Sequence, residues 1–100
     1  MVKHVILWML KDEYSSEQKA KIKAEMKQAL EDLKGKIPGL LEIKVYTVGL
    51  ASSNADVMLD SSFEDEQALK TYATHPLHVA AADSKVRPFT ASRSCLDFEL

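Results

Sequence analysis

The sequence predicts an α+β fold of the ferredoxin-like type, in which the elements follow one another as β-α-β-β-α-β. Two stretches place apolar residues at helical spacing, and four shorter stretches alternate apolar and polar residues as strands do. The link at residues 51–54, between the second and third strands, is too short for a crossover helix, so these two strands are expected to pair antiparallel. Two βαβ halves of this kind close into a four-stranded antiparallel sheet with both helices on one face.

Length and composition indicate a single domain over residues 1–100. Apolar residues make up 46% of the chain and charged residues 28%, and no segment has the bias of a linker or repeat. The net charge of −2, without a basic stripe beyond the first helix, argues against nucleic acid as a partner. The apolar run at 5–10 is too short for a signal peptide or a membrane span. We therefore expect a cytoplasmic protein without a membrane partner. The single cysteine, Cys95, cannot form an internal disulfide and lies in a strand pattern, so we expect it to be buried.

The first strand, at residues 3–10, is apolar on both of its alternating faces. One face carries Ile6, Trp8 and Leu10 after His4, and the other carries Val5, Leu7 and Met9. A strand of this kind is covered on both sides.

The first helix is expected over about residues 16–34, ending at Gly35. Ser15 and Gln18 have the spacing of a capping box, which satisfies backbone donors at a helix start. Its apolar face is formed by Ile22, Met26, Ala29, Leu30, Leu33 and Ile37.

The two middle strands are expected at 40–49 and 56–63. Leu41, Ile43 and Val45 share one face of the earlier strand, which begins after the turn residues Pro38-Gly39. In the later strand Val57, Leu59 and Phe63 share one face, while Met58, Asp60 and Ser62 share the other.

The second helical segment is expected to break at Pro76, within the sequence Tyr72-Ala73-Thr74-His75-Pro76-Leu77-His78. Proline disfavours a helical conformation in the residue before it and suits the first position of a new helix. One helix should therefore end near Thr74 and another should begin at Pro76. His78 then lies in the first turn of the new helix, where the positive end of the helix dipole disfavours imidazolium, and we expect its ring to be neutral near pH 7.

The last strand, at residues 89–99, leads to the prediction of a homodimer. Its face with Leu96, Phe98 and Leu100 alternates with a face that carries Cys95, Asp97 and Glu99. Helices can cover one face of the sheet only, whereas the first strand is apolar on both. A second copy packed against the uncovered face would complete a barrel-like core, the dimeric α/β barrel.

The chain resembles the stress-responsive dimeric A/B-barrel (Dabb) family almost from end to end. The matching blocks are Val2-Lys3-His4-Val5-Ile6-Leu7, Lys11-Asp12-Glu13, Lys36-Ile37-Pro38-Gly39-Leu40, residues 55–64, and Tyr72 with His75-Pro76-Leu77-His78. The resemblance implies a homodimer, but fold alone does not assign a reaction.

Within this family the sequence resembles olivetolic acid cyclase, which closes a linear polyketide-CoA by an aldol condensation without a cofactor. The resemblance implies that His78 is a catalytic base, Tyr72 an orienting phenol, and His4 a residue lining the same pocket. Two departures argue against transferring the substrate, because Val57 and Met26 stand where the cyclase has a pocket histidine and a pocket tyrosine. The predicted ligand is an apolar carbonyl compound or an aromatic ring. Trp8, Met26 and His75 are further candidates to contact it.

Each candidate also has a purely structural interpretation. His78 can bond a neighbouring backbone group, Tyr72 can be a core phenol, and His75 can cap the helix junction. His4, in a covered strand, needs a partner for its ring, which we expect to lie near His78. These three histidines could also hold a metal, but no Asp, Glu or Cys is singled out to complete such a site, and we predict no metal and no cofactor.

Two classes of function remain. One is a cofactor-independent enzyme or a small-molecule pocket built from His78, Tyr72 and His4. The other is a non-catalytic stress or assembly module, in which the histidines serve the fold. Haem or quinol oxidation, found elsewhere in the superfamily, has no motif of its own here.

Overall fold

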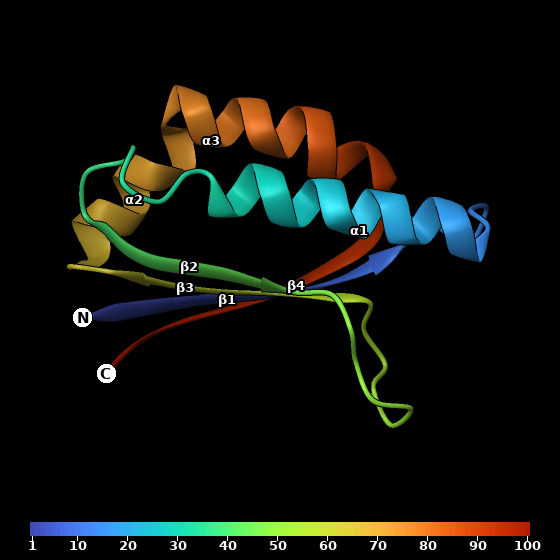
Figure 1. The fold of residues 1–100 in the computed structure, drawn as a ribbon. Coiled ribbons are helices and arrows are strands. Elements are labelled where there is room, and N and C mark those ends of the chain that lie inside the picture. The colour runs from blue at the N-terminus through green and yellow to red at the C-terminus, as the bar shows by residue number, and fades with distance from the viewer.

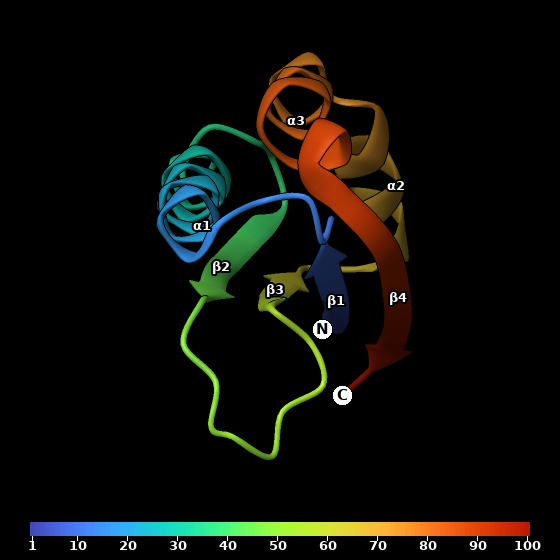
Figure 2. The same cartoon turned by 90° about the vertical axis from the view of Figure 1, so that its right-hand side faces the viewer.

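The computed structural model describes residues 1–100 and confirms the predicted order of elements (Figure 1). The elements are β1 (Val2–Leu10), α1 (Ser16–Glu31), β2 (Leu40–Tyr46), β3 (Val57–Phe63), α2 (Glu66–Thr74), α3 (Pro76–Ala81), the π-turn η1 (Ala82–Val86), the 3₁₀ turn η2 (Arg87–Phe89) and β4 (Thr90–Glu99). The sheet is antiparallel with strand order β2-β3-β1-β4. All helices lie on one face of it (Figures 1 and 2). None of them has both the length and the apolar composition that a membrane crossing requires.

The core lies between the sheet and the helices. Along β1 every second residue, from Val2 through His4, Ile6 and Trp8 to Leu10, is buried against the helices. In β3 the buried residues Val57, Leu59 and Phe63 share one face, as predicted. Helix α1 contributes Ile22, Met26 and Leu30.

Helix α1 has the predicted capping box but is shorter than predicted. The Ser15 side chain accepts a hydrogen bond from the Gln18 backbone N–H, and the Gln18 side chain accepts one from the Ser15 N–H. The helix ends at Glu31 rather than Lys34, because the backbone N–H groups of Leu33, Lys34 and Lys36 bond to carbonyls three residues back. Gly35, with φ +81°, then reverses the chain.

Strand β2 corrects one predicted face. Leu41 was expected to be buried with Ile43 and Val45, yet it is 43% exposed, whereas Leu40 is buried. The pairing with β3 shifts register between Leu40 and Glu42, and this β-bulge turns Leu41 outward. The strand also ends at Tyr46 rather than at residue 49.

The helix break at Pro76 is confirmed. Helix α2 ends at Thr74, His75 has extended dihedral angles (φ −64°, ψ 133°), and α3 begins at Pro76. The backbone continues as the short π-helix η1 to Val86, which is buried together with Ala82.

Strand β4 lies at an edge of the sheet and is mostly uncovered. Apart from Thr90, which is half-buried, its residues are exposed. The prediction that Cys95 is buried is therefore wrong: the helices do not cover this edge strand, and the thiol is accessible.

The face opposite the helices is open in the single chain. Leu7, Leu96 and Phe98 are among its exposed apolar residues. The loop at 47–56 extends away from the helices beyond this face and carries Val48 and Leu50, which are largely exposed (Figures 1 and 2). The sheet does not close on itself, since β2 and β4 are both edges.

Candidate functional site

A cleft runs between the β1–β4 side of the sheet and the helical segment α2–α3. It has an inner cleft of about 390 Å³ and an outer cleft of about 620 Å³, which share His4, Leu69, Ala73 and Arg93. The inner cleft is also lined by Ile6, Trp8, Tyr72, His78, Ala82, Val86, Arg87 and Thr90. The outer cleft is also lined by Val2, Glu66, Lys70, Cys95, Asp97, Phe98 and Glu99. Both volumes lie in the range of small-molecule sites.

His78 enters the inner cleft half-buried from α3. Its Nδ1 lies 3.2 Å from the Ala73 carbonyl oxygen, which can only accept, so Nδ1–H donates and Nε2 keeps a free lone pair. Burial lowers the pKa of His78 below 6.5, and the charges of Arg87, His4 and Arg93 lower it further, against the opposing effect of the Ala73 bond. The lowered pKa agrees in direction with the neutral ring expected from the sequence, but its main cause is desolvation rather than the helix dipole.

Tyr72, on α2, places a phenol beside the His78 ring. The two ring centroids lie 4.2 Å apart, with an angle of 35° between the ring planes. Tyr72 is 1% exposed, and its hydroxyl has no hydrogen-bond partner. Burial raises the pKa of Tyr72 well above its usual value of 10, so the hydroxyl stays protonated and can donate.

His4 has its partner on β4 rather than near His78, which corrects the expectation from the sequence. His4 lies directly opposite Asp97 in the β1–β4 pairing, and its Nδ1 is in hydrogen-bond contact with Asp97 Oδ1. The ring centroid of His4 is 6.2 Å from that of Tyr72. His4 therefore joins the aromatic wall of the inner cleft to the polar group on β4.

Cys95 lies beside this His4–Asp97 pair. Its Sγ is 3.4 Å from Asp97 Oδ1 and 3.7 Å from His4 Nδ1. Partial burial raises the pKa of the thiol, as does the neighbouring Asp97 carboxylate.

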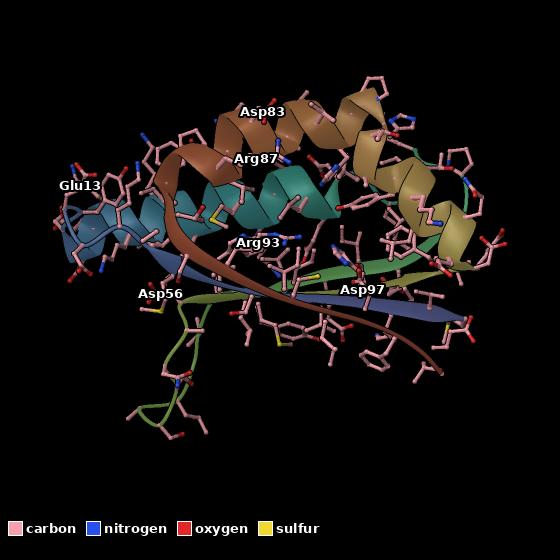
Figure 3. All side chains as sticks on the ribbon, turned by 180° about the vertical axis from the view of Figure 1, so that it is seen from behind. Glu13, Asp56, Asp83, Arg87, Arg93 and Asp97 are labelled. Carbon is pink, nitrogen blue, oxygen red and sulfur yellow. The ribbon has the colours of Figure 1, made fainter.

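The inner cleft is lined by two arginines and by no acidic residue. Arg87 forms an ion pair with Asp83 on the helical side, whereas no carboxylate pairs with Arg93. Figure 3 shows Arg93 between β4 and the helical layer, below Arg87, with Asp97 farther along β4. Sequence reasoning missed Arg93. The available signal was its place two residues before Cys95, on the same face of β4 as Asp97.

The structure brings four of the six predicted site residues together and leaves two apart. His4, Trp8, Tyr72 and His78 all line the inner cleft. Met26 is fully buried in the core beneath α1 and lines neither part of the cleft. His75 also lies outside it, and its Nδ1 accepts a hydrogen bond from the Leu77 backbone N–H, which makes it the cap of α3.

Comparison with known structures shows the same architecture in other proteins. A dimeric Bacteroides fragilis protein of unknown function with a ferredoxin-like fold is 34% identical, with a TM-score of 0.91 over 99% of this chain and 95% of that one. A dimeric ferredoxin-like Thermobifida fusca protein of unknown function is 24% identical (TM-score 0.78, coverage 99% and 90%). The hydroxynitrile lyase of Passiflora edulis is 19% identical (TM-score 0.72, coverage 97% and 90%).

No curated protein sequence matches the chain. The family model of the stress responsive A/B barrel domain, Dabb, matches residues 2–100, which is nearly the whole chain. This match agrees with the β-α-β-β-α-β order and the open sheet described above. The chain therefore belongs to the stress-responsive A/B barrel (Dabb) family.

Proposed function

We propose that this protein is a cofactor-independent acid–base enzyme that acts on a small apolar or aromatic carbonyl compound in the inner cleft. One observation carries the proposal: Tyr72, whose buried hydroxyl has no partner, lines the same cleft as His78, whose Nε2 is free. A buried hydroxyl without a partner is costly in the free protein, and a ligand oxygen would relieve that cost.

The chemistry begins with removal of a proton from a carbon next to a carbonyl group. His78 Nε2 takes the proton, the C–H electron pair moves into the carbonyl group, and an enolate forms. The Tyr72 hydroxyl donates to the enolate oxygen, and the unpaired positive charge of Arg93 favours the new negative charge. Attack of the enolate carbon on a second carbonyl group forms the new C–C bond, and His78 returns the proton to the resulting alkoxide. General base catalysis of this type contributes roughly 10²–10⁴-fold in rate.

The walls of the inner cleft support an apolar substrate body. Ile6, Trp8, Leu69 and Val86 supply aliphatic and aromatic surface around the two polar rings. The volume of about 390 Å³ suits a compound with one ring or a short acyl chain. Met26 lies in the core, and Val57 is buried in β3, so this chain lacks the two additional polar pocket residues of the cyclase that it resembles.

A hydroxynitrile lyase has the same fold, which supports an enzymatic use of the scaffold. At 19% identity it supports no transfer of substrate or of residue roles.

We further propose that the active form is a homodimer closed across the open face of the sheet. The exposed apolar residues Leu7, Leu96 and Phe98 would be covered in such a pair. The Bacteroides fragilis relative, which is 34% identical, is described as dimeric.

One observation favours a non-catalytic alternative, in which the histidines serve the fold and the dimer is the functional unit. The hydrogen bond from His78 to Ala73 is local, and it satisfies that ring nitrogen without any ligand.

Native mass spectrometry of the purified protein, followed by denaturing extraction, separates the two proposals. A dimer with a stoichiometric apolar carbonyl or aromatic ligand, lost in Tyr72→Phe, is expected for the enzyme. An empty dimer that also binds no member of a panel of aryl ketones would support the structural module instead.

A further inference from the structure

We propose that His4, Cys95 and Asp97 bind one zinc-type divalent cation at the outer cleft. The three side chains come from the paired strands β1 and β4, and one ligand atom from each lies within 4.8 Å of the other two. This inference goes beyond the proposed acid–base function and does not depend on it.

The spacing of the ligand atoms fits a tetrahedral zinc site. Zn–S bonds of about 2.3 Å with Zn–N and Zn–O bonds of about 2.0–2.2 Å place tetrahedral ligand atoms about 3.4–3.6 Å apart. Cys95 Sγ already lies 3.4 Å from Asp97 Oδ1 and 3.7 Å from His4 Nδ1. The His4 and Asp97 atoms are hydrogen-bonded and must separate to about 3.4 Å to bind one ion, for which we propose a rotation of the Asp97 side chain. The Asp97 side chain is 45% exposed at an edge strand and can make this rotation.

The donor set selects the class of metal. A thiolate, an imidazole and a carboxylate together suit zinc and its first-row neighbours, whereas magnesium and calcium favour all-oxygen sites. Binding requires the thiol and the imidazole nitrogen to lose their protons, so it releases protons. The thiolate and the carboxylate then balance the two positive charges of the ion. This balance offsets the repulsion from Arg93, which lines the same outer cleft.

The site has room for a fourth ligand. Three protein ligands leave one tetrahedral position for water or a small molecule. His4, Cys95 and Asp97 line the outer cleft of about 620 Å³, into which that position would open. The His4 ring also forms part of the inner cleft, so a bound ion would fix the orientation of a ring that faces Tyr72.

Cobalt(II) is the probe that tests this assignment, because it replaces zinc and reports its ligands spectroscopically. Untagged, reduced, chelator-treated protein is titrated with CoCl₂ under anaerobic conditions. We expect one ion per chain, a near-ultraviolet thiolate-to-cobalt charge-transfer band, and visible bands of tetrahedral intensity. Stoichiometric ZnCl₂ should remove all of these signals.

Variants then assign the ligands. Cys95→Ser should abolish the thiolate-to-cobalt charge-transfer band. Both Cys95→Ser and Asp97→Asn should weaken zinc binding by at least about tenfold, because changes even to residues outside the ligand shell weaken metal sites by about 10–100-fold. His75→Asn, at a histidine outside the cluster, should leave the titration unchanged. Failure of tens of micromolar cobalt to produce the band in the wild-type protein would overturn the proposal. An undiminished band in Cys95→Ser would also overturn it, and circular dichroism of each variant excludes unfolding as the cause of a loss.

Discussion

Replacing Tyr72 by phenylalanine separates a functional hydroxyl from a structural one by the sign of the stability change. The ring is buried against Phe63 and His78, at centroid distances of 4.9 and 4.2 Å, and phenylalanine keeps this packing. The hydroxyl itself has no partner. An unsatisfied buried polar group costs about 1–3 kcal/mol, whereas loss of a made hydrogen bond destabilises by about 0.5–1.5 kcal/mol.

Tyr72→Phe should therefore stabilise the free protein by about 1 kcal/mol or more. For a domain of this length each kcal/mol corresponds to a rise in Tm of about 4–8 °C. Calorimetry at a fixed protein concentration measures the change, because the Tm of a dimer depends on concentration. Tyr46→Phe, at a residue that is 53% exposed, is the matched control and should change the free energy of unfolding by less than about 0.5 kcal/mol. A fall in Tm for Tyr72→Phe alone would refute the reasoning, because it would reveal a structural partner for the hydroxyl.

Three further predictions concern His78, the turn before β2, and the open face. Because burial lowers the pKa of His78, the unfolded chain takes up a proton at higher pH than the folded one. The free energy of unfolding of the wild type should therefore fall relative to that of His78→Gln as pH drops below about 6.5. Urea unfolding at pH 5–8 measures this difference, and a difference that does not change with pH would contradict the lowered pKa. Gly39→Ala should lower the free energy of unfolding by roughly 2–5 kcal/mol, because the added Cβ lies 2.5 Å from Ala68 Cβ and the backbone φ is +83°. Gly35→Ala, at φ +81° with open space around it, should lower it by only about 1–2 kcal/mol in the same assay. Equal losses in the two variants would rule out the clash. Phe98→Asp should convert the proposed dimer to a monomer in light scattering at micromolar concentration, and an intact dimer would place the interface elsewhere.

The fold could be predicted because each element carries a local signal. The strand at residues 3–10, the capping box of α1 and the proline break at position 76 depend on neighbouring residues, and all three are confirmed. The errors arose where the backbone departs from regular helix or strand geometry. Helix α1 ends early in tight turns, and a bulge that alternation cannot reveal turns Leu41 outward.

The candidate site was predictable only in part, because its second half depends on strand register. Tyr72 and His78 lie close together in sequence, whereas His4 and Asp97 meet through a pairing between the two ends of the chain. Sequence alone also could not show that β4 is an edge strand left uncovered by the helices. Cys95 is therefore accessible, and Arg93 lies unpaired in the cleft.

The central claim is that His78 removes protons from carbon in the inner cleft, and hydrogen–deuterium exchange tests it without knowledge of the natural reaction. Aryl and alkyl methyl ketones, including 4-phenylbutan-2-one, are incubated with the protein in deuterated buffer, and loss of the α-proton signals is followed by NMR. Exchange should saturate with ketone concentration and fall by at least about 100-fold in His78→Gln, which keeps a neutral side chain. Exchange by the wild-type protein that never exceeds the rate with an equal concentration of imidazole, or that is unchanged in His78→Gln, would contradict the account.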